Sequence, residues 1–71
     1  MKAMKLKALT EFAEQVFEDL ANNDTLKFLK FDCELKDKIL NVSHKKMNIK
    51  PMVIKTLLIK GGLSDNDYEV L

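Results

Sequence analysis

The chain has 71 residues, a hydrophobic fraction of 46% and a charged fraction of 32%. This composition indicates one small globular domain spanning residues 1–71 and excludes disordered and collagen-like classes. No apolar run reaches the roughly 18 residues of a membrane span, and Cys33 is the only cysteine, which excludes an intrachain disulfide and a multi-cysteine zinc site. We therefore expect a cytoplasmic protein that has no membrane partner.

Charge is arranged in blocks, although the formal net charge is only +1. Residues 1–10 sum to +3, residues 11–34 to −5, residues 35–60 to +6 and residues 61–71 to −3. Such segregation favours one basic surface and a polyanionic partner, and an ordinary solvated surface is the alternative. All 12 basic residues are lysine, which lacks the planar fork that reads guanine edges. The pattern therefore favours contact with a phosphate backbone over reading of base sequence.

The first predicted helix follows Thr10. Apolar residues recur at three- and four-residue spacing over residues 9–21, with acidic residues between them, which is typical of an amphipathic helix. Thr10 is expected to cap the first turn, and residues 22–24 are expected to end the helix. Residues 1–8 alternate between apolar and lysine side chains. They are predicted to form either a short edge strand or a tail.

A hairpin is predicted next. From Leu29 to Leu35 apolar and charged residues alternate with period two, so residues 26–35 are expected to form a half-buried strand. Residues 36–38 then form a short turn, and residues 39–44 form the second strand of the hairpin.

Pro51 and the Gly61-Gly62 pair bracket an apolar run that is predicted to be a helix. Proline has its φ preset for the first helical turn, and glycine supplies the left-handed stop. A buried strand is the alternative for this run. Residues 65–71 are predicted to form the last strand, with Tyr68 exposed. The order α-β-β-α-β predicts an α+β fold, a small two-layer domain with its helices packed on one face of a small, mainly antiparallel sheet.

Few polar residues are placed for catalysis or metal binding. Cys33 and His44 lie on the two strands of the predicted hairpin, and a thiol beside an imidazole can be nucleophilic. However, Cys33 shares a face with apolar residues, and a small buried thiol is the better interpretation. The acidic helix over residues 11–21 could collect divalent cations, but a solvated face is the ordinary role of such carboxylates. We therefore expect a protein that is not an enzyme and has no catalytic residues, metal site, cofactor or small-molecule substrate.

The predicted RNA-binding site is a set of lysines in the second half of the chain. The hairpin turn and the loop after it are expected to bring five of these lysines to one end of the domain. Tyr68 is the only aromatic residue expected to be exposed, which argues against base stacking as the main mode of binding. The set consists of Lys36, Lys38, Lys45, Lys46, Lys50, Lys55 and Lys60.

The stretch over residues 38–71 resembles the eukaryote-type ribosomal protein twenty-two of the large subunit, in a reduced form. The residues that carry the resemblance are the strand 38–43, the helix residues Lys55, Leu58 and Lys60, and the pair Leu63 and Asp65 before the last strand. A loose similarity continues back through the first helix. The resemblance implies an α+β structural component of the large ribosomal subunit that contacts ribosomal RNA and neighbouring ribosomal proteins. The basic segment that the family carries between its first helix and hairpin is shorter here, and the family's charged tail is missing.

A second resemblance, to the opening of frataxin-like proteins, rests on the acidic helix followed by residues 31–35 and 39–42. It implies iron binding on the acidic helix and a role in iron-sulfur cluster assembly, but Pro51 and the absence of tryptophan and of a closing helix count against it. A generic protein-interaction module is the third alternative. The leading prediction is a ribosomal protein that binds the rRNA backbone through lysines.

Overall fold

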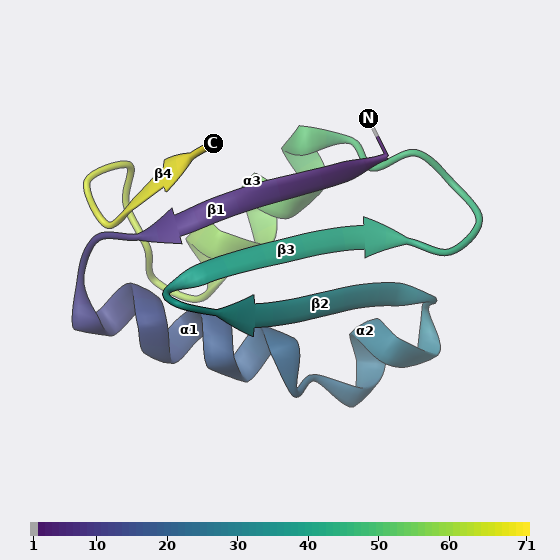
Figure 1. Ribbon diagram of the computed structural model, residues 1–71, viewed down its shortest axis with the longest axis horizontal. Coiled ribbons are helices and arrows are strands. Elements are labelled where there is room, and N and C mark those ends of the chain that lie inside the picture. Colours follow the sequence, from purple (N-terminus) through teal and green to yellow (C-terminus); the bar gives the residue numbers. More distant parts are fainter. Residues whose placement is uncertain (1) are drawn as a thin grey trace.

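The computed structural model describes residues 2–71 and has an α+β fold with the element order β-α-α-β-β-α-β. The strands are β1 (Ala3–Ala8), β2 (Phe31–Lys36), β3 (Ile39–His44) and β4 (Tyr68–Val70), and the helices are α1 (Glu11–Ala21), α2 (Asp24–Phe28) and α3 (Pro51–Lys60) (Figure 1). The predicted α+β class is confirmed. The predicted order lacked α2 and left β1 undecided.

The strands form one antiparallel sheet in the order β2-β3-β1-β4. Strands β1 and β2 are connected through α1 and α2 and have β3 between them. Strands β3 and β4 are connected through α3 and have β1 between them. Each pair is a split β-α-β arrangement. Of the two alternatives for residues 1–8, the strand is confirmed and the tail is not, but β1 lies inside the sheet and not at its edge. Leu6 pairs with Leu40 of β3 on one side and with Val70 of β4 on the other.

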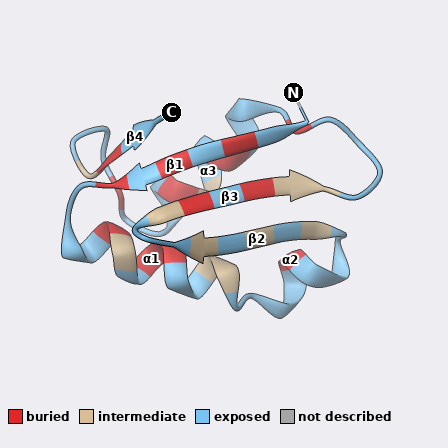
Figure 2. Ribbon diagram, viewed as in Figure 1, coloured by how far each residue is buried: buried red, intermediate tan, exposed pale blue. Residues whose placement is uncertain are grey.

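The core lies between one face of the sheet and the helices α1 and α3. Leu6 and Leu40 from the sheet, Phe17 from α1 and Leu58 from α3 all have no exposed surface and belong to one cluster. Buried and exposed residues alternate along β1 and β3, as Figure 2 shows. The helices therefore cover one face of the sheet, as predicted, and the other face is open to solvent.

Part of the predicted strand 26–35 is the short helix α2. Asn23 caps this helix, because its side-chain oxygen accepts a hydrogen bond from the N–H of Leu26 at 2.9 Å. Leu26 is buried, with 7% of its surface exposed, and anchors the helix. Lys30 then adopts a left-handed φ of 72° and ends the helical segment before β2 begins. Half-buried and exposed residues alternate only from Phe31 onward, because Leu29 and Lys30 are both exposed. The predicted strand therefore began too early.

The hairpin turn and the second strand agree with the sequence. Asp37 and Lys38 have φ angles of 53° and 67°, as both central residues of a two-residue type I′ turn require. The carbonyl of Lys38 also accepts a hydrogen bond from the N–H of Ala8 at 2.8 Å. This bond fastens the turn to the end of β1.

The predicted helix boundaries at Thr10, Pro51 and the glycine pair are confirmed. The Thr10 hydroxyl accepts from the N–H of Ala13 at 3.1 Å, and Pro51 is the first residue of α3. Gly62 takes the left-handed φ of 95° that ends α3. At Gly61 the end of α3 approaches α1 so closely that an added Cβ would lie 2.8 Å from Cγ1 of Val16. Within residues 2–71 no helix is long and apolar enough to cross a membrane.

Candidate nucleic-acid interface

His44, the last residue of β3, organises the loop that follows it. Its Nδ1 accepts hydrogen bonds from the backbone N–H groups of Lys46 and Met47, both at 3.0 Å. Because Nδ1 faces two donors, the ring proton lies on Nε2, which donates to the carbonyl of Leu29 at 2.9 Å. The ring also packs edge-on against Phe31, with centroids 4.8 Å apart. The residue is half-buried, and its two ring nitrogens hold the loop in place.

This loop brings lysines from three segments to one end of the molecule. The N–H of Lys45 donates to the carbonyl of Lys30 at 3.0 Å, which joins the loop to the end of α2. Lys2, which precedes β1, lines an open hollow of about 340 Å³ with Lys45 and Lys46. We call Lys2, Lys30, Lys45 and Lys46 the basic tip. All four are exposed, and none has an acidic partner within 4.0 Å among the residues that the structure describes.

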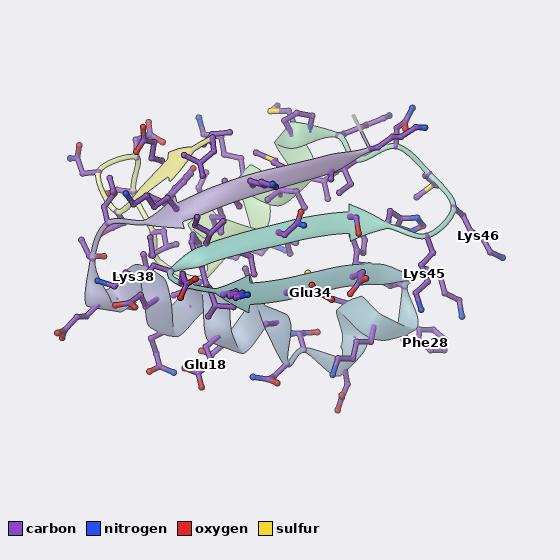
Figure 3. All side chains as sticks on the ribbon, viewed as in Figure 1. Glu18, Phe28, Glu34, Lys38, Lys45 and Lys46 are labelled. Atoms are coloured by element: carbon purple, nitrogen blue, oxygen red, sulfur yellow. The ribbon has the colours of Figure 1, made fainter. Side chains whose placement is uncertain are left out.

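Exposed apolar side chains accompany the basic tip. Phe28 is 80% exposed at the end of α2, and Leu29 and Met47 are 50% and 61% exposed. Leu29 and Met47 are neighbours through His44, which bonds to the backbone of both. Figure 3 places Phe28 at the same end of the molecule as Lys45 and Lys46. The tip therefore combines free cations with an accessible aromatic ring.

The predicted lysine set does not gather at one end. Lys38 lies at the hairpin turn, and Figure 3 shows it at the opposite end of the long axis from Lys45 and Lys46. Lys36 ends β2 beside the same turn, across from Ile39. The physical reason is simple: the turn of a hairpin and the loop that leaves its second strand lie at opposite ends of the strands, so they cannot form one site.

The remaining predicted lysines belong to α3. Lys50 immediately precedes α3 and makes no side-chain capping bond, and it lines a small pocket with His44 and Met47 beside the basic tip. Lys55 forms an ion pair with Asp65 at 3.9 Å, and Lys60 ends the helix. Of the seven predicted lysines, only Lys45 and Lys46 belong to the basic tip, with Lys50 close by.

Sequence reasoning missed Lys2 and Lys30. Lys2 reaches the tip because β1 runs antiparallel to β3, which sets Ala3 opposite Ser43. Lys30 reaches it because the carbonyl of Lys30 pairs with Lys45. The signal for Lys30 was present in the hairpin prediction, since any register that pairs residues 31 and 44 also brings residues 30 and 45 together. No comparable signal existed for Lys2, because the pairing of β1 with β3 joins distant parts of the chain.

The groups weighed for catalysis and metal binding do not form a site. Burial and, to a lesser extent, the nearby Asp32 carboxylate raise the pKa of the Cys33 thiol, so the reactive thiolate is disfavoured. Both nitrogens of His44 are engaged with backbone groups. Within residues 2–71 no cluster of three or more histidine, cysteine, aspartate or glutamate side chains is arranged to hold a metal ion. Glu18 of the acidic helix α1 points away from the sheet and from the tip (Figure 3).

Within residues 2–71, the central strands of the sheet carry no aromatic ring on its open face. The outward residues of β1 are Ala3, Lys5 and Lys7, and those of β3 are Ile39, Asn41 and Ser43. Proteins that bind single-stranded RNA on a four-stranded sheet stack bases on aromatic residues there. This face lacks such residues, which leaves the basic tip as the stronger candidate for binding RNA.

Comparisons with protein-family models, curated proteins and solved structures found no match for this chain. The ribosomal and frataxin-like resemblances therefore stay predictions from the sequence.

Proposed function

We propose that this protein binds the phosphate backbone of RNA through the basic tip, as a structural component rather than an enzyme. The observation that carries the proposal is the gathering of Lys2, Lys30, Lys45 and Lys46, all exposed and, among residues 2–71, without an acidic partner within 4.0 Å. Unpaired lysines can neutralise phosphates and release the counterions condensed on the nucleic acid, which drives binding. The partner that the sequence resemblance favours is large-subunit ribosomal RNA together with neighbouring ribosomal proteins, in the cytoplasm.

Local charge supports this proposal better than total charge does. The chain as a whole carries only +1, so it has no strong general attraction to polyanions. Three of the four carboxylates of α1 are exposed, and Glu18 points away from the tip in Figure 3. A nucleic acid would therefore be attracted to one end of the molecule and oriented by the acidic side.

A pair of charge reversals tests the proposal. The test variant is Lys45→Glu/Lys46→Glu, and the matched control is Lys36→Glu/Lys38→Glu, which makes the same charge change at the opposite end of the same hairpin. Binding to a fluorescein-labelled RNA hairpin is measured by anisotropy over a series of KCl concentrations. We expect the tip variant to lose binding and the control to keep most of it. Equal losses in both variants would show that overall charge, not the tip, governs binding.

The salt dependence adds a quantitative check. If four lysines contact phosphates, a plot of the logarithm of the binding constant against the logarithm of the salt concentration should have a slope of about −3. In the tip variant this slope should be at least about half smaller in magnitude. The ribosomal part of the proposal is tested separately by sedimenting ribosomes from the source cells. The wild type should sediment with them at low salt and be released at high salt, and the tip variant should stay in the supernatant. A wild type that never sediments with ribosomes contradicts the ribosomal assignment.

A further inference from the structure

Phe28 has a more exposed side chain than any other large hydrophobic residue within residues 2–71, at 80%. The other rings are engaged. Phe17 and Tyr68 are buried, at 0% and 8% exposed, so the expectation of an exposed Tyr68 is wrong. Phe31 packs on the His44 ring. Phe12 is 51% exposed, but the end of its ring lies against Gly62, where an added Cβ would be 3.1 Å from its Cζ. Phe28 is thus the ring that the fold leaves for an external contact.

The backbone that carries Phe28 is held on both sides. Before it, the Asn23 side chain caps the helix at Leu26. After it, the N–H of Leu29 donates to the carbonyl of Thr25 at 2.9 Å, and the carbonyl of Leu29 accepts from Nε2 of His44. The bond between Lys30 and Lys45 then closes the connection to the loop. Because this backbone is already ordered, a ligand that stacks on the ring does not have to order the segment that carries it, which favours binding.

We propose that Phe28 stacks on an unpaired base of the RNA whose phosphates the basic tip neutralises. This inference rests on the proposed function and makes it more specific, because it requires a single-stranded nucleotide at the tip. Aromatic rings beside lysines are the usual means of binding single strands, since every base has a flat face to stack. A fully paired duplex offers no free base face, so it would engage the lysines alone.

The surroundings of Phe28 favour a nucleotide over a lipid surface. Helices that lie on membranes need a long apolar face along the helix, and α2 has only five residues, of which Leu26 is turned into the protein. Lys30, in contrast, follows Phe28 by two residues and is joined by its backbone to Lys45, which lies at the same end of the molecule as the ring (Figure 3). The ring and the cations together match the alternation of base and phosphate along a single strand.

The test replaces Phe28 and keeps every lysine. Phe28→Ala is compared with Met52→Ala, a control that removes a similarly exposed apolar side chain (76%) on α3. Affinity is measured over a series of KCl concentrations for an RNA hairpin with an unpaired loop, for the same sequence as single-stranded DNA, and for a fully paired RNA duplex. We expect Phe28→Ala to weaken binding to the unpaired RNA by about 5- to 150-fold, to leave duplex binding unchanged, and to keep the wild-type salt slope. Met52→Ala should change none of these.

A second variant gives a readout other than affinity. The chain contains no tryptophan, so Phe28→Trp introduces a single one, whose fluorescence should be quenched by the unpaired RNA and not by the duplex. Loss of binding in Lys45→Glu/Lys46→Glu but not in Phe28→Ala would overturn the stacking inference and leave the proposed function standing. Loss in neither variant would overturn both. Equal quenching by RNA and DNA supports stacking and shows that the site does not select the sugar. Quenching by vesicles of phosphatidylcholine and phosphatidylserine, with none by RNA, would overturn the inference in favour of a membrane surface.

Discussion

Replacing His44 with alanine should loosen the basic tip without removing any of its lysines. The substitution deletes three hydrogen bonds, to Leu29, Lys46 and Met47, and the edge-on contact with Phe31. A net hydrogen bond contributes about 0.5–1.5 kcal/mol, and an aromatic contact adds about 0.5–1.5 kcal/mol. Because water can reach the freed backbone groups, the lower ends apply, which gives a loss of about 2 kcal/mol. For a domain of this size that loss lowers the melting temperature by about 10 °C.

Two measurements check the expected effect of His44→Ala. Thermal unfolding gives the loss of stability, and amide hydrogen exchange followed by NMR reports on the N–H groups of Lys46 and Met47, which should exchange faster than in the wild type. Asn41→Ala, an exposed change on the same strand, is the control and should alter neither quantity. RNA affinity should also fall, because the lysines are no longer held in place. Unchanged exchange at Lys46 and Met47 would refute the role given to the imidazole.

Three further predictions concern the scaffold. Gly61→Ala should destabilise the fold by about 1–3 kcal/mol in chemical denaturation, although alanine favours helices, because the new Cβ would meet Val16 at 2.8 Å; a stabilised variant would contradict this close approach. Leu40→Ala, at a residue with no exposed surface on a central strand, should cost about 2–5 kcal/mol by the same measurement, and a loss below about 1 kcal/mol would mean that the core is looser than described. The pKa of Asp67 is lowered from 3.8 by hydrogen bonds from the Ser64 N–H and hydroxyl and from Thr10, so the carboxylate stabilises the fold above pH 3.8 and this contribution disappears as pH falls through the lowered value. Asp67→Asn should therefore be less stable than the wild type at neutral pH and equal to it in strong acid, and a stability gap that persists in acid would count against the ionic origin.

Local patterns in the sequence predicted most of the elements. Strand β3 and the limits of α3 follow from alternation and from the proline and glycine signals, which act within a few residues. Segment 24–30 was assigned wrongly because Leu26 is an isolated anchor, and a helix of five residues is too short for periodicity to reveal. The side-chain cap from Asn23 was the available signal.

The candidate site was less predictable than the fold, because it depends on which distant segments meet. The sequence indicated that Lys45 and Lys46 are exposed, but not that the hairpin turn with Lys38 would lie at the far end. It placed Phe28 on a strand, although the short helix leaves that ring in solvent. The role of His44 depends on bonds to backbone groups of two separate segments, which no spacing of residue types encodes.

The central position of β1 has a consequence for how the chain acquires its shape during synthesis. Met4 and Leu6 pair with Val42 and Leu40. These apolar side chains therefore stay exposed to solvent in the nascent chain until β3 has been made. Helix α1 can form early from local contacts, but the sheet has no partner for its first strand until β3 emerges. Contacts between residues so far apart in sequence slow folding and prolong the exposure of hydrophobic surface. A chaperone that shields β1 would therefore benefit the nascent chain most before β3 has left the ribosome.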